Sequence, residues 1–457
     1  MKYRPSAAAT SSDSSRSTAA RASGSTYSLF VFGDSLSDTG RLLAATGLPP
    51  SPPYFNGRIS NGPVAVEQLA DQLGLQISAT NFAIAGAQTG RLNNNDTDTL
   101  KLGGLQDQID QFKAQAAGLD AGPEDLYLIW AGANDFFIQP SNPIGTATAA
   151  VNNIKTAVSS LIQAGAKNIV VAQTPNLGRT PASLQAGLLE AGTQLSNLFN
   201  ASLEATLDTI PEEANIILAD LFTRTEAIAG DPARFGFTNI TTPFLSGLTP
   251  APAPADPNQF FFWDIFHPTT RAHALLTETF RSTSVTAITD DLTRRGTVAP
   301  ERFVGYSGAD LLQGLGGADQ LVGNPGRDRL LGGAQNDSLS GGGNPDSLTG
   351  GAGQDSLTGG AGRDQFIYSN PSHGRDTILD FQVGKDQIDL RAILNRPGYD
   401  QPDRFAAYVR LRQRPSGTLV QVDGNGDRSG GFQPLALLSN VQPGDLTAAS
   451  FRLGGSS

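Results

Sequence analysis

The residues that could do chemistry lie in four short segments far apart along the chain. The first, Phe30 to Gly40 (FVFGDSLSDTG), leads an apolar run into Gly-Asp-Ser and presents Ser35 as a nucleophile. The last contains Asp264 and His267, a carboxylate three residues before an imidazole. A serine hydroxyl is a weak nucleophile until a base takes its proton. We therefore predict His267 as the base, with Asp264 holding the imidazole and stabilising its charged form.

Two segments between these supply candidate donors for an oxyanion. NFAIAG ends on Gly86, and GAND, directly after the apolar run Leu126 to Trp130, contains Asn134. The backbone N–H groups of Ser35 and Gly86 and the side-chain amide of Asn134 are predicted to face the oxyanion of a tetrahedral intermediate. Loss of one such donor typically lowers turnover by about 10²-fold to 10³-fold.

Other polar and aromatic residues near these segments have more than one interpretation. The chain has three histidines, and His273, in a predicted helix, is expected to be structural. Asp34 and Asp38 could form a carboxylate pair or a metal site, but hydrogen bonding within the tight turn is favoured. Six aromatic residues could line an acyl pocket, although core packing is the commoner role. They are Phe136, Phe137, Phe260, Phe261, Phe262 and Trp263.

The elements that must position these residues follow from the apolar pattern. Short apolar runs alternate with helical patterns from Tyr27 to about Arg295, which is typical of an α/β domain with a mainly parallel sheet. The expected strands are Ser28–Phe32, Asp125–Ala131, Asn168–Gln173 and Ala214–Ala219. The expected helices are Val64–Leu73, Ala150–Ala164 and Ser183–Thr209. Because open α/β sheets bind ligands at the carboxyl ends of their strands, the serine, glycine and asparagine segments are expected at one edge.

Taken in order, the four segments resemble the GDSL, or SGNH, hydrolase family over about Tyr27 to Thr286. The stretch PPYFNGRISNGPVAVEQLA is similar to its plant-type and haemolysin-like lipase branch. The resemblance implies a flavodoxin-like three-layer α/β sandwich and a serine ester hydrolase, a carboxylesterase or lipase. It assigns the family's functional positions to Ser35, Gly86, Asn134 and His267, with Asp264 completing the triad.

The composition limits the class of protein and partner. A chain of 457 residues exceeds a single core, so two or three domains are expected. The formal net charge of −11 argues against a nucleic-acid partner. Cys is absent, which excludes disulfides and thiolate zinc sites. We see no apolar run suited to a transmembrane segment or a Sec signal, so neither is expected.

A strict nine-residue period begins beyond Glu301. Each unit starts with Gly, carries Asp five residues later and a large apolar residue two residues after that. The glycine half predicts a turn whose carbonyl groups face inward with the carboxylate, and the other half predicts a short strand. The aspartates are Asp310, Asp319, Asp328, Asp337, Asp346, Asp355 and Asp364. The apolar residues, predicted to stack as a thin core, are Leu312, Leu321, Leu330, Leu339, Leu348, Leu357 and Phe366.

These units resemble the RTX β-roll family, which implies structural calcium bound by the seven aspartates. Carboxylate and carbonyl oxygens are the ligands that calcium prefers. Without the ion the inward carboxylates would repel one another, so a disordered segment is expected. A flexible Gly-rich linker is the alternative, but it has no reason to keep this register. Gln335 and Asn344 replace Gly at the fourth position, so one or two sites are expected to be weak or missing.

Four parts are therefore predicted. They are a disordered tail (1–25), an SGNH hydrolase domain (26–296), an RTX β-roll (301–368) and a β-rich C-terminal cap with a secretion segment (369–457). The leading hypothesis is a secreted, extracellular ester hydrolase that uses no cofactor for its chemistry. The RTX resemblance implies the type I secretion apparatus as a partner.

Two further hypotheses stay open. One is a phospholipase or haemolysin-like acyltransferase acting on membrane lipids. The other is a calcium-dependent surface-attachment protein with an inactive hydrolase scaffold, against which the intact triad argues.

Overall fold

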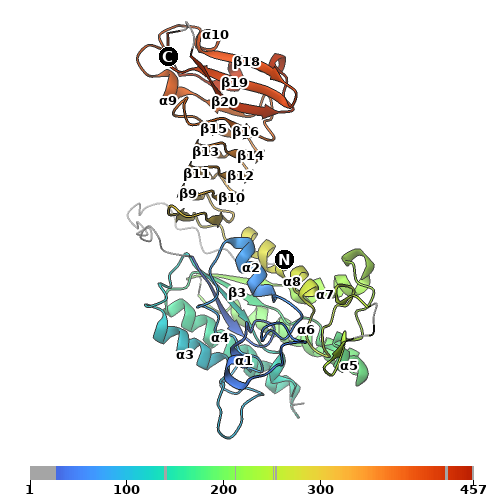
Figure 1. Cartoon of the computed structure of the whole chain (residues 1–457). Helices are drawn as coiled ribbons and strands as arrows, with labels where there is room; N and C mark the ends of the chain where they lie inside the picture. Colours follow the sequence, from blue (N-terminus) through green and yellow to red (C-terminus); the bar gives the residue numbers. More distant parts are fainter. Residues whose placement is uncertain are drawn as a thin grey trace. The chain divides into compact units, whose positions relative to one another are not determined.

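The computed structural model describes residues 27–137, 141–211, 213–250, 252, 255–427 and 431–454. The predicted disordered tail, residues 1–25, lies outside the described residues. The chain divides into two compact units, of which one ends at Ala287 and the other begins at Ile288 (Figure 1). The boundaries predicted near residues 296, 301 and 368 stay predictions.

A parallel sheet in the order β1-β2-β3-β4 forms the centre of the first unit. Its strands confirm all four expected from the sequence. They are β1 (Leu29–Gly33), β2 (Leu126–Trp130), β3 (Asn168–Ala172) and β4 (Asn215–Ala219). Every residue of β1, β2 and β3 is buried, as expected for a parallel sheet that is covered on both faces.

A fifth stretch lies along the free edge of β1 without forming a regular strand. The N–H of Leu29 donates to the Gln76 carbonyl at 2.8 Å, and the N–H of Phe82 donates to the Val31 carbonyl at 2.8 Å. An isolated parallel bridge joins Val31 to Asn81. Counting this stretch as the second, the sheet has the order 2-1-3-4-5 of flavodoxin-like folds. The stretch brings the loop that contains Gly86 to the carboxyl edge.

Helices cover both faces of this sheet. On one face α3, α4 and α6 enclose the aromatic core around Phe30 and Tyr127, whose rings stack at 5.0 Å. On the other face Trp130 packs against Phe280 of α8. The helices are α1 (Arg41–Thr46), α2 (Ala65–Leu73), α3 (Leu105–Gln115), α4 (Pro143–Gln163), α5 (Pro181–Gln185), α6 (Leu189–Leu207), α7 (Leu221–Gly230) and α8 (Thr270–Ala287). None of the helices in the described ranges is long and apolar enough to cross a membrane.

Two helices differ from the sequence prediction. The single helix expected over Ser183–Thr209 is broken into α5 and α6, and Gly187 between them takes a φ of +70°. Helix α4 begins seven residues before the expected Ala150, because Asn142 accepts a hydrogen bond from the N–H of Gly145 and caps it. An Asn-Pro pair is a helix start signal that the apolar pattern did not contain.

Short elements complete the first unit. A small hairpin pairs β5 (Leu245–Ser246) with β6 (Thr249–Pro250). The short 3₁₀ turns are η1 (Ala133–Asp135), η2 (Leu177–Arg179), η3 (Ala233–Phe235) and η4 (Pro257–Gln259).

The second unit is a parallel β-roll whose strands alternate between two sheets. From β7 to β17 each strand pairs with the strand two positions along the chain. The full orders are β21-β17-β15-β13-β11-β9-β7 and β18-β19-β20-β16-β14-β12-β10-β8. The roll strands are β7 (Thr293–Arg295), β8 (Arg302–Val304), β9 (Leu311–Gly316), β10 (Gln320–Pro325), β11 (Arg329–Ala334), β12 (Ser338–Gly343), β13 (Ser347–Ala352), β14 (Ser356–Ala361) and β15 (Gln365–Ile367). The predicted apolar residues stack inside it, each at most 1% exposed.

The C-terminal part combines further turns of the roll with antiparallel strands. It contains β16 (Asp376–Ile378), β17 (Gln387–Asp389), α9 (Arg391–Leu394), α10 (Arg404–Tyr408), β18 (Val409–Arg414), β19 (Gly417–Asp423), β20 (Phe432–Ser439), η5 (Pro443–Asp445), η6 (Ala448–Ser450) and β21 (Phe451–Arg452). Strands β18, β19 and β20 form an antiparallel meander on one sheet.

Asp376 and Asp386 continue the row of aspartates beyond the predicted seven. Asp376 accepts from the N–H of Asp355, and Asp386 accepts from the N–H of Asp364, each at 3.1 Å. These pairs are 21 and 22 residues apart instead of 18. The nine-residue period missed them because short insertions break the spacing.

The seven predicted aspartates are at most 3% exposed and share one bonding pattern. The Oδ1 atom of each accepts a backbone N–H from 18 residues earlier, at 2.8 or 2.9 Å. Among the described residues no donor reaches the buried Oδ2 atoms of six of them, Asp319, Asp328, Asp337, Asp346, Asp355 and Asp364. Buried oxygens without donors are costly, and an oxygen-binding cation would satisfy them.

These buried aspartate oxygens therefore fit the calcium that the sequence predicts. Nowhere in the described ranges do three acidic, histidine or cysteine side chains gather at one point. Carbonyl oxygens of the glycine turns would have to supply much of each ion's coordination. Meanwhile burial raises the pKa of Asp319 to about 6, of Asp337 and Asp346 to about 7, and of Asp328 to about 8.

Without calcium, the second unit is expected to lose stability as the pH rises from about 4 to about 8. The carboxyl groups have a raised pKa in the folded chain, so over this range it binds more protons than the unfolded chain does. Calcium binds the deprotonated form and should restore stability at the upper end. Thermal melts of the full chain by circular dichroism at pH 5 and pH 8, with chelator or with calcium, measure both effects. An unchanged spectrum and melt on chelation at pH 8 would contradict the calcium expectation.

Candidate active site

Ser35 lies two residues beyond the carboxyl end of β1, at a strand end that is tightly fixed. Gly33 has a φ of +156°, and a Cβ there would lie 2.2 Å from the carbonyl oxygen of Trp130. The close approach of β2 therefore requires glycine. The buried side-chain amide of Gln108 accepts from the N–H of Gly33 and donates to its carbonyl, both at 2.8 Å. These contacts fix the position of Ser35 at the carboxyl edge of the sheet.

The two aspartates beside the serine bind the backbone of the turn. Asp34 Oδ1 accepts from the N–H of Leu36 at 3.1 Å. Asp38 accepts from the N–H of Gly40 at 2.7 Å, and its other oxygen accepts from the N–H of Ala85 at 2.8 Å. The structure thus gives both the turn role that the sequence favoured. Asp38 also joins the serine turn to the loop of Gly86.

Ser35, His267 and Asp264 lie together in one hydrogen-bonded row. His267 Nε2 is 2.8 Å from Ser35 Oγ, and His267 Nδ1 is 2.8 and 2.9 Å from the two carboxylate oxygens of Asp264. An ionised carboxylate accepts and cannot donate, so Nδ1 must carry the proton. The lone pair of Nε2 is therefore directed at the serine hydroxyl.

The electrostatics of the pair favour this arrangement. Burial alone would lower the pKa of His267, but the charge and hydrogen bond of Asp264 outweigh it and raise that pKa. Burial would likewise raise the pKa of Asp264, yet the attraction of His267 leaves it below its ordinary value. Burial raises the pKa of the neighbouring Asp34 to about 7. Asp264 is thus the ionised partner of the imidazole at neutral pH.

A segment around residues 54–61 braces the loop that carries the triad's acid and base. The hydroxyl of Tyr54 donates to Asp264 Oδ2 at 2.9 Å. Ser60 Oγ donates to the carbonyl of Pro268, and Asn61 Oδ1 accepts from the N–H of Thr270, both at 2.8 Å. Sequence reasoning noticed this segment as part of a lipase-like stretch but assigned Tyr54 no role.

The oxyanion candidates come from two loops that are bonded to each other. Asn134, in η1, donates from Nδ2 to the carbonyl of Ala87 at 3.1 Å, which leaves its second amide hydrogen free to bind a ligand. The carboxylate of Asp135 accepts from the N–H of Thr89 at 3.0 Å and from its hydroxyl at 2.7 Å. The Gly86 and Asn134 loops are therefore held in one relative position.

Gly86 occupies a place where a side chain does not fit. Its φ is +85°, and a Cβ would lie 2.3 Å from Asn95 Nδ2 and 2.5 Å from Asn93 Oδ1. Within the described part of the chain, no acceptor takes the backbone N–H of Ser35 or of Gly86. Neither donor is used within the described residues, and their role toward an oxyanion stays a prediction.

His273 is a structural residue in the first unit. Its Nδ1 atom is 3.2 Å from the backbone N–H of Ala65, and burial lowers the pKa of His273 to about 3. The ring is therefore neutral and accepts this hydrogen bond.

A pocket with about 930 Å³ of empty space, including solvent at its mouth, opens beside Ser35 and His267. Three of the six aromatic candidates line it, namely Phe137, Phe261 and Phe262. The other three belong to cores, because Phe136 packs against Phe199 while Phe260 and Trp263 surround Phe244. Phe266, which the sequence analysis did not single out, also lines the pocket and lies 4.6 Å from Phe137 between ring centres.

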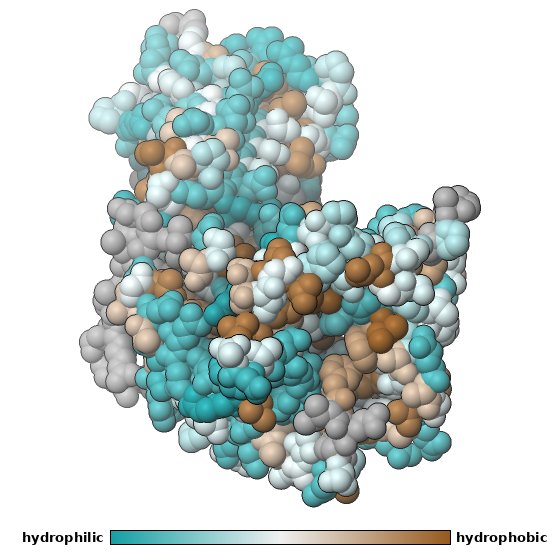
Figure 2. Space-filling model, turned by 60° about the horizontal axis from the view of Figure 1, so that its bottom comes forward, coloured by the Kyte–Doolittle hydropathy of each residue, from teal (hydrophilic) through white to brown (hydrophobic). Residues whose placement is uncertain are grey.

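Apolar side chains also reach the surface in places. Phe137, which lines the pocket, is 41% exposed, and Ile265 beside the triad is 41% exposed. Figure 2 shows apolar residues as brown patches separated by hydrophilic ones on the face that it presents.

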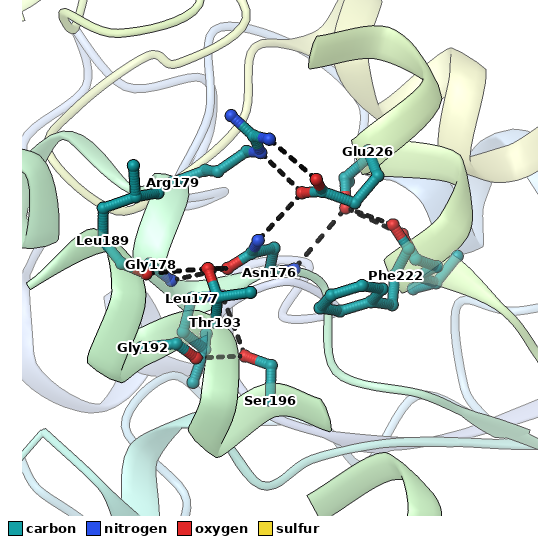
Figure 3. Close-up of polar contacts among 12 residues, drawn as sticks. Asn176, Leu177, Gly178, Arg179, Leu189, Gly192, Thr193, Ser196, Phe222 and Glu226 are labelled. Carbon is teal, nitrogen blue, oxygen red and sulfur yellow. Dashed lines mark hydrogen bonds and ion pairs between the residues drawn. The ribbon is translucent and has the colours of Figure 1, made fainter. Parts of the chain in front are cut away.

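Asn176 and Arg179, which line the pocket, belong to a polar cluster between η2 and α7 (Figure 3). The carboxylate of Glu226 accepts from Arg179 Nη2 at 2.7 Å and from Asn176 Nδ2 at 2.8 Å. The Asn176 side chain also accepts from the N–H of Gly178 at 2.9 Å and from the hydroxyl of Thr193 at 3.0 Å. Glu226 therefore ties the loop after β3 to α7.

Comparison with protein families matches both units. Residues 29–280 match the family described as GDSL-like lipase/acylhydrolase. Residues 304–339 and 331–366 match the RTX calcium-binding nonapeptide repeat. The second match accounts for the calcium-type ladder of the roll, although it ends before Asp376 and Asp386.

Several curated proteins are similar to more than half of this chain. The phosphatidylcholine-sterol acyltransferase of Aeromonas hydrophila is 28% identical, over 55% of this chain and 88% of that protein. A GDSL esterase/lipase of Arabidopsis thaliana is 27% identical, over 56% of this chain and 86% of that protein. Esterase EstA of Pseudomonas putida is 30% identical over 58% of this chain, which spans 48% of that esterase.

A solved structure, a putative GDSL-like lipase from Parabacteroides merdae, aligns with 58% of this chain and 98% of its own. Its TM-score of 0.34 and identity of 14% are too low to support an argument. The family match is decisive by itself. Because it spans residues 29–280, more than half of the chain, this protein belongs to the GDSL-like lipase/acylhydrolase family and is an ester-bond hydrolase.

Proposed function

We propose that the chain hydrolyses carboxylic esters, lipid esters among them, through a covalent acyl-enzyme on Ser35. His267 serves as general base and acid, and Asp264 orients and stabilises it. The observation that carries the proposal is the row of contacts at 2.8 Å from Ser35 Oγ to His267 Nε2 and from Nδ1 to Asp264.

The proposed reaction has two halves. In the first, the serine proton moves to His267 Nε2 while Oγ attacks the ester carbonyl, and the oxyanion forms facing Ser35 N–H, Gly86 N–H and Asn134 Nδ2. The intermediate then collapses, and His267 gives its proton to the departing alcohol. In the second half, water loses a proton to His267, attacks the acyl carbonyl and releases the acid, and Ser35 regains its proton.

Calcium is proposed to serve the fold of the second unit, and the reaction is proposed to use no cofactor. Each proton transfer and each oxyanion contact above has a group of the chain to perform it. The RTX repeats favour an extracellular location, where calcium is plentiful. Export by a type I secretion apparatus belongs to the same proposal, and the absence of Cys is compatible with it.

A second candidate is transfer of the acyl group to an alcohol, or hydrolysis of phospholipids. Similarity to the acyltransferase of Aeromonas hydrophila favours it, because transfer and hydrolysis share the acyl-enzyme and differ in the acceptor. Product analysis with phosphatidylcholine and an acceptor alcohol separates them, since transfer gives an acylated alcohol and hydrolysis gives free fatty acid. An inactive scaffold is disfavoured by the intact contact between Ser35 and His267.

Ser35→Ala and His267→Ala are each expected to lower kcat on p-nitrophenyl butyrate by at least about 10⁴-fold, because the nucleophile or its base is lost. Ser37→Ala is the matched control. Ser37 lies in the same turn, and its buried hydroxyl has no partner among the described residues. Its variant should keep its activity. Substantial hydrolysis by either triad variant would refute the assigned site.

The pH profile reports the pairing of His267 with Asp264. The base must be neutral, so kcat/KM is expected to fall toward acid, with a midpoint above the ordinary histidine pKa because that pKa is raised. Asp264→Asn should lower kcat by roughly 10⁴-fold and move the midpoint to lower pH. A midpoint that stays in place in the variant would contradict the pairing.

Tyr54→Phe tests the brace on the acid. The variant keeps the ring and removes the hydrogen bond to Asp264 Oδ2. Since hydrogen bonds to charged groups contribute about 1.5–3 kcal/mol, kcat should fall about tenfold with little change in KM. Steady-state kinetics with a melting curve measure this, and an unaltered kcat would show that Tyr54 does not position Asp264.

A further inference from the structure

We propose that the pocket beside Ser35 is an acyl-chain site, and that Ala229 on α7 determines how long an aliphatic chain it accepts. This inference rests on the proposed acyl-enzyme and names the part of the substrate that the pocket binds. No residue of α7 was singled out from the sequence, which placed candidate pocket residues beside the catalytic segments.

The inner wall of the pocket is buried and apolar. It is formed by side chains from β2, α7, α8 and the segment before the triad's acid, all at most 7% exposed, namely Trp130, Ile228, Phe261, Phe262 and Leu276. Leu177 and Ile240 add half-buried apolar surface. Such a lining gains free energy by removing methylene groups from water. Buried polar residues also belong to the lining, but Asn176, Thr180 and Thr225 already bond to groups of the chain.

The charges in the lining do not favour an acidic substrate. Apart from Asp34 and His267 at the catalytic end, Arg179 is the charged residue among those that line the pocket. Its guanidinium is already paired with Glu226 through two hydrogen bonds (Figure 3). The charge of Arg179 is thus balanced by that carboxylate, so a phosphate or carboxylate would meet an ion pair and not a free cation. An alkyl chain need not disturb the pair.

The hydrogen bonds of Glu226 also hold α7 in a fixed position beside the pocket. Glu226 binds Arg179 and Asn176, which come from the loop after β3, and Thr225 on the same helix lines the pocket. Two parts of the pocket lining, the loop after β3 and α7, are thus joined by hydrogen bonds. A side chain enlarged on α7 would therefore have to occupy pocket space and could not easily push the helix outward.

The order of the reaction assigns the pocket to the acyl group. The alcohol leaves after the first half-reaction, while the acyl group stays bonded to Ser35 until water attacks. A pocket that is lined by Ser35 and by buried apolar side chains can hold the acyl chain throughout both halves. The alcohol needs a path to solvent, which a buried inner wall does not provide.

Ala229 and Ala227 form a matched pair for testing this. Both lie on α7, but Ala229 is half-buried and lines the pocket, whereas Ala227 is exposed and does not line it. In Ala229→Phe the ring would enter the pocket, and in Ala227→Phe it would enter solvent. Comparing the two separates loss of pocket length from any general effect of a larger residue on the helix.

The experiment uses the full chain, with calcium, and two substrate series. One varies the acyl group of p-nitrophenyl esters from acetate to decanoate, and the other varies the alcohol of acetate esters. Ala229→Phe is expected to lower kcat/KM for decanoate tenfold or more, in line with the effect of a few methylenes in a pocket, and to leave acetate unchanged. Ala227→Phe should match the wild type in both series.

Three outcomes would overturn the inference. They are an unchanged acyl preference in Ala229→Phe, a loss confined to the alcohol series, or an equal loss in Ala227→Phe. If Ala229→Phe does not fold, Ile240→Asn tests the same wall with a polar group, with the exposed neighbour variant Thr241→Asn as control. It should lower kcat/KM for decanoate and spare acetate, and equal effects on both esters would count against the pocket. Wild-type protein inactive on every ester would instead refute the proposed function.

Discussion

The double contact between Asp264 and His267 is the interaction on which the site depends. Burial disfavours the charged form of each group, but the partner outweighs this effect. As a result the pKa of Asp264 is lowered and the pKa of His267 is raised. The contact also fixes which ring nitrogen faces Ser35. A free imidazole could rotate or change tautomer, so the other contacts of the loop matter mainly by holding this pair in place.

Those contacts share a design in which one buried polar side chain bonds to the backbone of another loop. Asp38 reaches the backbone of Ala85, Asn134 that of Ala87, and Ser60 that of Pro268. Loops at the end of a sheet lack the ladder of hydrogen bonds that aligns strands. Removing one partner of such a bond leaves a buried group unsatisfied at about 1–3 kcal/mol, which makes each loop position well determined.

Much of the fold was predictable because it depends on local pattern. The four strands are compact apolar runs, and the roll repeats Gly, Asp and Leu with a fixed period, so spacing alone placed Leu312 or Asp337 on the inside. Ser35, Gly86, Asn134, Asp264 and His267 could be named since each stands in a short motif beside a strand or a loop. Their proximity is a consequence of sheet order, which the sequence suggests through alternation of elements.

What the sequence did not predict depends on contacts between distant residues. The stretch along the edge of β1 was not predicted as a strand, and hydrogen bonds to the distant residues Leu29, Val31 and Gly33 place it. Tyr54 lies 210 residues from Asp264, and no spacing rule relates them. Ala229 is an ordinary helical alanine in sequence, and its place in a pocket follows from the packing of α7 against the loop after β3.

The two units handle buried carboxylates in opposite ways. Asp264 is bonded to His267 of the same unit, which can carry a positive charge. The contacts that hold the loop of Asp264 come from residues 54–61 and 264–270. Burial raises the pKa of roll aspartates such as Asp328 and Asp337, neighbouring aspartates raise it further, and no cation of the described residues offsets this. Charge balance in the first unit is therefore internal, while charge balance in the second must come from solution. The contacts that hold the triad thus all come from the first unit, and none of them involves an aspartate of the roll.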